Sequence, residues 1–157
     1  MNKITVVAIF LAAIILGSAA WNYTHQPQYT AEGFIILTKD DSRLLTEADI
    51  KSYNATSYTL TLTDECADKI RMMRDPLIGD FSIIVDGEED LSGIFVPSII
   101  SRSYPSSEVV IVYPSFDSDY TIMKIQMGYP WDQPSGYDPR QYSKMIQHFD
   151  KNGKLTG

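Results

Sequence analysis

Asp86, Glu88, Glu89 and Asp90 place four carboxylates within five residues, a group that could bind a cation, relay a proton or meet a basic partner. A calcium-binding loop needs acids at alternating positions, a glycine at the sixth position and a glutamate at the twelfth. The run "DGEEDLSG" has a different spacing. Asp86-Gly87 is typical of a hairpin turn, because glycine accepts a positive φ angle. We therefore predict a solvated hairpin tip, with contact to a cation or a partner as the alternative.

Other patterns that carry catalysis or bind metals are missing from the sequence. The two histidines, His25 and His148, lie far apart, and no HxH or HExxH motif is present. Cys66 is the only cysteine, so an intramolecular disulfide and a cysteine-based zinc site are excluded. No G-x-S-x-G elbow occurs. We predict no enzymatic activity, no catalytic residue, no metal ligand and no cofactor. A hydrolase with a dispersed site is the less favoured alternative.

The stretch "GYPWDQPSGYDP", residues 128–139, combines aromatic residues with three prolines. Proline limits the entropy of a loop, and aromatic rings supply contact area at a small rotamer cost. The stretch is therefore a candidate partner-binding loop. The alternative is an ordered connection that packs its aromatic rings over the edge of a sheet. Together with the acidic turn, it gives the candidate partner contacts Glu88, Glu89, Asp90, Tyr129, Trp131 and Tyr137.

Composition and charge limit the classes of function. The chain has 157 residues, of which 44% are hydrophobic and 21% are charged, as is typical of a globular protein. The net charge is −7 and the sequence pI is about 4.7, so the phosphates of a nucleic acid would be repelled. We predict an acidic, soluble surface and no nucleic-acid partner.

The N-terminus predicts export. Lys3 precedes an uncharged run, residues 4–21. Its 18 residues approach the length that spans a membrane, and Trp21 would then lie at the interface. Ser18 and Ala20 also fit the small residues before a signal-peptide cleavage site. Both a transmembrane anchor and a cleaved signal peptide remain open.

Under both alternatives, the rest of the chain lies outside the cytoplasm. Residues 22–32 are polar and contain a proline, which indicates a linker. Residues 33–157 are predicted to form a single extracytoplasmic domain, either held at the cell membrane by one span or released as a secreted or periplasmic protein.

Six segments have the apolar or alternating pattern of strands: 33–38, 57–63, 81–87, 92–100, 108–113 and 120–127. The fourth segment is interrupted by Pro97. The fifth, "EVVIVY", is nearly all apolar, which predicts burial on both faces of a sheet.

Two helices are expected. The first follows Thr63 as N-cap, and its apolar stripe contains Cys66, Ala67, Ile70 and Met73, so Cys66 is a predicted core residue. The second covers residues 138–149, with Asp138 as N-cap, Pro139 at the first helical position, and Asn152-Gly153 closing it. Its apolar stripe contains Tyr142, Met145, Ile146 and Phe149. Residues 45–50 are predicted to form one helical turn. The expected fold is α+β, a mixed or antiparallel sheet of five or six strands with two main helices on one face.

The central stretches "SYTLTLTDECADKI", "FSIIVDGEEDLSGIFVPSII" and "VVIVY" resemble the head subdomain of the first extracytoplasmic domain of SecD-type protein-export subunits. The resemblance covers about residues 46–113, and the turn and cap residues that carry it are Thr63, Asp86, Gly87, Ser92 and Pro97. It implies an α+β head outside the membrane that contacts a translocating or unfolded polypeptide.

The chain also departs from that family. SecD-type subunits have several membrane spans that contain proton-conducting acids, whereas this chain has at most one span, without a charge inside it. The resemblance therefore implies the fold and location of a SecD-type head and excludes its proton-driven motor. We expect a non-enzymatic domain that binds protein or peptide. The alternative is a sensor module for a small molecule or a cation.

Overall fold

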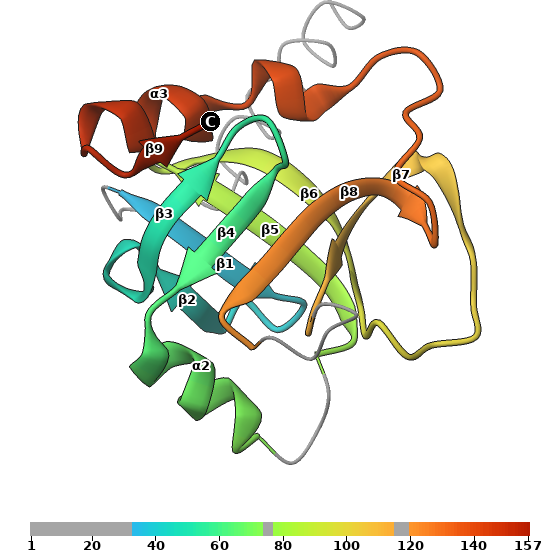
Figure 1. Cartoon of the computed structure of the whole chain (residues 1–157), viewed down its shortest axis with the longest axis horizontal. Coiled ribbons are helices and arrows are strands. Elements are labelled where there is room, and N and C mark those ends of the chain that lie inside the picture. The colour runs from blue at the N-terminus through green and yellow to red at the C-terminus, as the bar shows by residue number, and fades with distance from the viewer. Residues whose placement is uncertain (1–32, 74–76, 115–119) are drawn as a thin grey trace, which may run out of the picture.

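The computed structural model describes residues 33–73, 77–114 and 120–157, and in them nine strands form one mixed sheet (Figure 1). The strands are β1 (Phe34–Thr38), β2 (Arg43–Thr46), β3 (Ile50–Asn54), β4 (Thr59–Leu62), β5 (Gly79–Val85), β6 (Glu88–Val96), β7 (Tyr104–Val112), β8 (Ile122–Tyr129) and β9 (Leu155–Thr156). Their order in the sheet is β2-β1-β5-β6-β7-β8-β4-β3-β9. The helices are α2 (Asp64–Arg71), α3 (Lys144–Lys151) and the short 3-10 helices η1 (Glu47–Asp49) and η2 (Pro139–Tyr142).

The α+β prediction is confirmed, but the predicted strand count of five or six was wrong. The six predicted segments correspond to β1, β4, β5, β6, β7 and β8. The additional strands β2, β3 and β9 have two to five residues each. Strands this short carry too few side chains for a clear alternating pattern, so they are stabilised by the neighbours with which they pair.

The sheet is rolled, so that its two edge regions lie close together (Figure 1). β2 forms one edge, and β3 lies one strand from the other edge, yet only the three residues of η1 join them along the chain. A connection of this length spans roughly 14 Å at most. The β6–β7 and β3–β9 pairs are parallel, whereas the other pairs are antiparallel. The predicted helical turn at 45–50 is confirmed as η1.

The main core lies inside the rolled sheet. Alternate residues of the strands point inward, and Ile83 of β5 and Ile111 of β7 are fully buried there. α2 and α3 lie at opposite ends of the sheet (Figure 1), and each adds buried side chains to the same cluster, among them Ile70 and Phe149. On the outer face, Val96, Val110, Val112 and Tyr129 form a smaller buried cluster. The four residues from Val109 to Val112 are all buried, which confirms the prediction of burial on both faces.

The predicted hairpin at Asp86-Gly87 is confirmed. β5 and β6 pair antiparallel with Val85 opposite Glu88. Asp86 and Gly87 have φ angles of 51° and 84°. Positive φ at both central residues is the geometry of a type I′ turn, whose twist matches that of the flanking strands.

The first predicted helix begins as expected. The Thr63 hydroxyl accepts a hydrogen bond from the Cys66 N–H, which confirms the N-cap. Cys66, Ala67 and Ile70 are buried. Met73 is not part of the buried stripe, because α2 ends at Arg71 and leaves Met73 beyond the helix and exposed.

The predicted bounds of the second helix were wrong. Residues from Pro139 to Tyr142 form η2, and the α-helix begins only after Ser143, whose hydroxyl accepts from the Met145 N–H. Asp138 caps η2 instead, by accepting from the Arg140 N–H. As a result Tyr142 is excluded from the apolar stripe of α3 and is exposed, whereas Met145 and Phe149 are buried.

Cys66 is predicted to be unreactive in the folded protein. Burial raises the pKa of its thiol to about 11, and the Asp49 carboxylate contributes to this increase. At pH 8.5, a thiol reagent should therefore modify Cys66 about 100-fold more slowly in the folded chain than in urea, where the thiol pKa is about 8.5. Because the neutral thiol is favoured in the folded state, its contribution to stability is complete below about pH 8.5 and is lost as the pH rises toward 11. Equal rates of modification would contradict the burial of Cys66.

Removal of the Tyr53 hydroxyl is expected not to destabilise the protein, unlike most substitutions in a core. Its ring is fully buried, and its hydroxyl has no hydrogen-bond partner in the described part of the chain. Tyr53→Phe removes an unsatisfied polar group, so the free energy of unfolding should stay the same or rise by up to about 1 kcal/mol. Tyr129→Phe is the matched control, because the Tyr129 hydroxyl donates to the Ser98 carbonyl at 2.8 Å and its removal should cost about 1 kcal/mol. Urea unfolding measures both, and a larger loss for Tyr53→Phe than for the control would contradict the expectation.

The predicted anchor or signal peptide at 1–21 and the linker at 22–32 lie outside the described residues. Within the described residues, no helix has the length and apolar character needed to cross a membrane.

Candidate functional site

Three acids of the hairpin hold α3 in place, and we call Asp86, Glu88 and Asp90 the acidic strip. Asp86 lies in the turn, whereas Glu88 and Asp90 belong to β6, and Asp90 lies at an irregularity between the paired residues Glu89 and Leu91. The Glu88 carboxylate forms an ion pair with Lys144, in the first turn of α3. Asp86 lies near His148, with 3.5 Å between its Oδ1 and the imidazole Nδ1. Because Lys144 and His148 are four residues apart, they share one face of the helix.

Asp90 contacts the start of α3. It accepts a hydrogen bond from the Ser143 hydroxyl and another, at 2.8 Å, from the Lys144 N–H. A carboxylate at this position satisfies a free backbone N–H and interacts favourably with the helix dipole. The hydrogen bond with Lys144 lowers the pKa of Glu88, and the same contact raises the pKa of Lys144. The acids thus have partners within the domain and are not only a solvated tip.

Asp90→Ala is expected to lower the free energy of unfolding by about 1–2 kcal/mol, because α3 loses an interaction equivalent to an N-cap. Glu89→Ala is the matched control, since Glu89 is the adjacent acid and its carboxylate bonds to Ser82 of β5; its effect should stay within about 0.5 kcal/mol. Thermal unfolding of both variants measures the difference. Equal losses would show that the contact with α3 adds nothing to stability.

Glu89 lies on the opposite side of β6 from the acidic strip. It accepts a hydrogen bond from the Ser82 hydroxyl at 2.8 Å. It also lines an open hollow of about 390 Å³ together with Asp80 and Glu108. Within the described ranges, no group of three or more histidine, cysteine or acidic side chains is arranged to hold a metal ion.

The aromatic residues of the 128–139 stretch separate into two groups. Tyr129 ends β8 and is buried, as expected for a ring packed on the sheet. Trp131 and Tyr137 are 73% and 72% exposed. Tyr142, which follows in η2, is 70% exposed and stacks on Tyr137 with ring centroids 5.5 Å apart. The segment 130–142, called the aromatic segment below, therefore presents three large rings to solvent.

The buried side chain of Arg140 fixes the aromatic segment. It is 2% exposed and forms ion pairs with Asp138 at 2.8 Å and with Asp132 at 2.9 Å. It also donates to the Ile125 carbonyl in β8, and its guanidinium lies 4.0 Å from the centre of the Tyr58 ring. These contacts join both ends of the aromatic segment to the sheet.

Arg140 and Asp138 each stabilise the charge of the other. Burial alone would lower the pKa of Arg140, but its hydrogen bonds with Asp138 and Asp132 outweigh that effect and hold the pKa above its usual value. The hydrogen bond with Arg140 lowers the pKa of Asp138. Arg140 and Asp138 therefore both carry charge near neutral pH.

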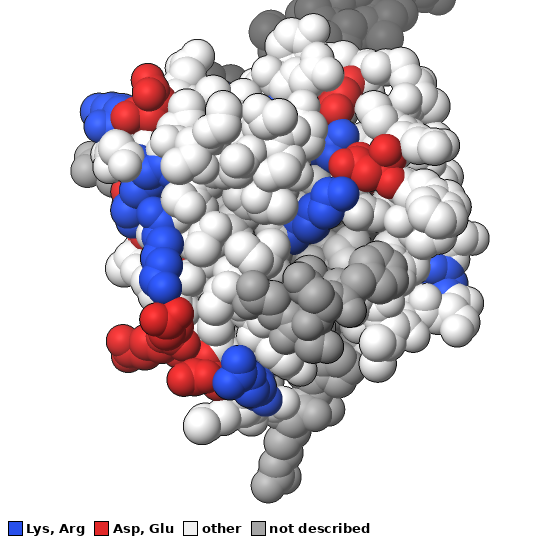
Figure 2. All heavy atoms as spheres, viewed as in Figure 1, with Lys and Arg blue, Asp and Glu red and all other residues white. Residues whose placement is uncertain are grey.

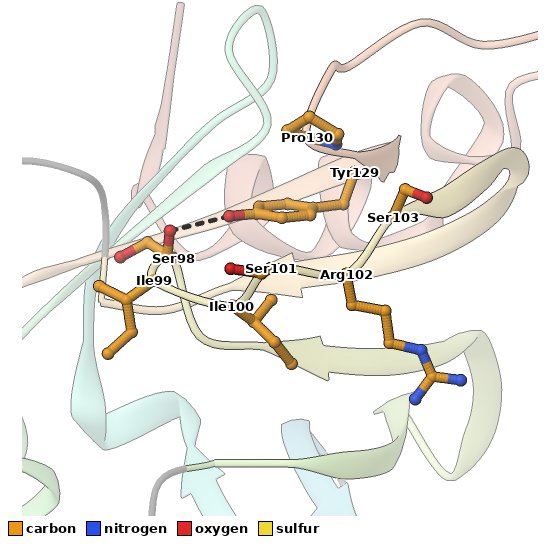
Figure 3. A pocket seen from close by; sticks show the side chains of 8 residues that line it. All are labelled: Ser98, Ile99, Ile100, Ser101, Arg102, Ser103, Tyr129 and Pro130. Atoms are coloured by element: carbon orange, nitrogen blue, oxygen red, sulfur yellow. Dashed lines mark hydrogen bonds between the residues drawn. The ribbon is translucent and has the colours of Figure 1, made fainter.

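A hollow of about 460 Å³ lies where residues 97–103 connect the parallel strands β6 and β7. Figure 3 shows the Tyr129 ring across this hollow, with its hydroxyl directed to Ser98. Among the described residues that line the hollow, Arg102 is the one with a charged side chain, and it extends away from the Tyr129 ring (Figure 3). The serine hydroxyls and the ring give the hollow a polar and aromatic lining without a converging set of charged groups.

Three features escaped the sequence analysis. Arg140 gave no signal, because an arginine next to a proline-rich stretch is normally exposed. Tyr142 was assigned to an apolar helical stripe. The contact of the acidic strip with α3 gave no local signal, since Asp90 and Ser143 are 53 residues apart in the sequence.

The resemblance to SecD-type subunits stays a prediction. The chain matches no family model, no curated protein and no solved structure.

Proposed function

We propose that this chain is a non-enzymatic domain that binds a protein or peptide outside the membrane through the aromatic segment. The observation that carries the proposal is the set of three large aromatic rings, Trp131, Tyr137 and Tyr142, each at least 70% exposed on a segment that the buried Arg140 holds in place. The proposal includes export through residues 4–21, as a membrane anchor or a cleaved signal peptide.

The physical basis of the proposal is that an ordered surface loses little conformational entropy when it binds a partner. Tryptophan and tyrosine bury a large area while losing few rotamers, and they are enriched among residues that dominate binding energy. A segment already ordered by its own ion pairs has less conformational entropy to lose on binding. Contiguous exposed apolar surface is typical of interaction sites, and the Tyr137 and Tyr142 rings stack to form such a surface.

The distribution of charge supports an uncharged contact. On the face shown in Figure 2, acidic and basic side chains lie next to one another in small mixed groups, and no extended patch of one sign is visible. A partner with an extended apolar or aromatic stretch would fit this surface. The resemblance to a SecD-type head suggests the same chemistry, a translocating or unfolded polypeptide.

The test is affinity capture from the membranes of the source cells, with the full chain as bait. Trp131→Ala combined with Tyr137→Ala should reduce recovery of a protein partner at least tenfold, because two anchor residues are lost. Met72→Ala is the matched control. Met72 is 83% exposed but lies at the end of α2, on another part of the molecule, so recovery should not change.

Two results would contradict the proposal. One is equal recovery of every partner with the wild-type chain and with the double variant. The other is tight binding of a small molecule, without any protein recovered.

A further inference from the structure

The chain enters the domain at the end that carries α3. The Gly33 N–H donates to Asp86 Oδ1 at 3.1 Å, and the Asp86 N–H donates to the Gly33 carbonyl at 2.9 Å. Asp86 belongs to the acidic strip, whose Asp90 accepts a hydrogen bond from the Lys144 N–H at the start of α3. The point of entry is therefore joined to the hairpin tip and, through it, to α3.

The aromatic segment lies at this same end. It leads directly into α3, because Tyr142 is followed by the N-cap Ser143. α3 has eight residues, and a helix of this length spans only about 12 Å. The aromatic segment and α3 both run across one end of the rolled sheet, whereas α2 lies at the other end (Figure 1). The exposed rings and the entry of the chain thus share one end of the domain.

The linker predicted at residues 22–32 is short compared with the domain. Its eleven residues cover about 20 Å as a flexible chain and at most about 40 Å when fully extended. A domain of this size is roughly 35 Å across. A membrane anchor at residues 4–21 would therefore hold the end that carries Gly33 toward the bilayer, with α2 on the far side.

We propose that the aromatic segment binds an integral membrane protein, at an extracytoplasmic stretch next to one of that protein's membrane spans. The proposal rests on the proposed function and takes residues 4–21 as a retained anchor. Trp131, Tyr137 and Tyr142 are then held within the reach of the linker from the membrane surface. Membrane proteins are enriched in tryptophan and tyrosine at this depth, and aromatic rings pair favourably with one another. The exposed rings and such a stretch are therefore complementary in position and in chemistry.

The orientation is measured by energy transfer from a dye on the full chain to acceptor dyes on lipid head groups. The chain is placed in phosphatidylcholine vesicles that contain a trace of labelled phosphatidylethanolamine. Ser135→Cys, in the aromatic segment, and Met72→Cys, at the end of α2, each supply an exposed labelling site, whereas Cys66 is buried. The dye at position 135 should transfer its energy at least about twofold more efficiently, because the domain separates the two positions. Equal efficiencies, or a greater efficiency at position 72, would overturn the proposal.

The partner is identified with a photoreactive benzophenone side chain at position 135 of the full chain, in membranes of the source cells. The cross-linked protein should have a membrane span within roughly a dozen residues of the cross-linked site, because the linker reaches no farther. The same group at position 72 is the matched control and should not give this product. Cross-links to lipid alone, or to a protein without a span near the site, would overturn the proposal. A chain recovered from these membranes without residues 1–21 would also overturn it.

Failure of this inference is distinguishable from failure of the proposed function. A cross-linked protein without a membrane span leaves peptide binding by the aromatic segment in place and removes only the location of the partner. Equal recovery of every partner with the wild-type chain and with the Trp131→Ala, Tyr137→Ala double variant removes the proposed function itself, whatever the orientation of the domain.

Discussion

Arg140→Met is expected to lower the free energy of unfolding by about 3 kcal/mol or more, because it leaves the buried Asp138 carboxylate and the partly buried Asp132 carboxylate without their partner. Asp138 is 4% exposed, and two of its contacts run to the Arg140 guanidinium. Asp132 would keep only Lys124, at 3.7 Å, and the Met127 N–H. Methionine fills a similar volume without a charge, so the loss reports mainly the unpaired carboxylates.

Urea unfolding of the full chain measures this effect, with Arg102→Met as the matched control. Arg102 is exposed and its guanidinium lies 5.2 Å from the Tyr104 ring centre, so its replacement should cost at most about 1 kcal/mol. Adding Asp138→Asn to Arg140→Met should recover part of the loss, because the amide carries no charge. Equal losses for the two arginine variants would show that the buried network does not stabilise the aromatic segment.

The effect of pH on this network has a definite sign. The pKa of Asp138 is lowered in the folded protein by its hydrogen bond with Arg140. Its contribution to stability is therefore present above the pKa of the unfolded carboxyl, about 3.9, and is lost as the pH falls through the folded value. The difference between wild type and Arg140→Met should accordingly shrink in acid.

The sequence predicts best those strands and helices that follow from the pattern of their own residues. β5, with Ile83, Ile84 and Val85 in succession, and α2, with its Thr63 cap, both follow from local patterns. β9 does not, since its two residues form a strand only because Leu155 pairs with Tyr53 of β3 across about a hundred residues of chain. Pairing over such a separation leaves no local trace.

In the candidate sites, too, local features were predicted and contacts between distant residues were not. Exposure of Trp131 and Tyr137 agrees with the predicted partner-binding loop, but the residue that orders the loop, Arg140, is recognisable only once the fold brings Asp132, Asp138 and Ile125 around it. The acidic turn was predicted correctly as a hairpin. Its acids were interpreted as solvated because a hairpin tip normally faces water, and no local pattern shows that α3 packs against this one.

The backbone of β7 passes very close to Gly93 of β6, which leaves no room for a side chain at this position. A Cβ atom at this position would lie 1.9 Å from the Val109 carbonyl oxygen and 2.7 Å from its carbonyl carbon. The parallel pairing of β6 with β7 begins at the next residue, where Ile94 lies opposite Val110. The register of β7 against β8 shifts just before Val109. The backbone of β7 therefore crosses directly over Gly93 as it enters the sheet.

Gly93→Ala should consequently lower the free energy of unfolding by about 3 kcal/mol or more, because backbone atoms cannot move aside as a flexible side chain can. Ser92→Ala, one residue earlier and exposed, is the matched control and should change stability by no more than about 0.5 kcal/mol. Urea unfolding of both variants measures the contrast. If alanine is tolerated at position 93 as well as at 92, β7 does not cross β6 this closely. The parallel pairing and the 97–103 connection that it requires would then be wrong, whereas the antiparallel β5–β6 hairpin would be unaffected.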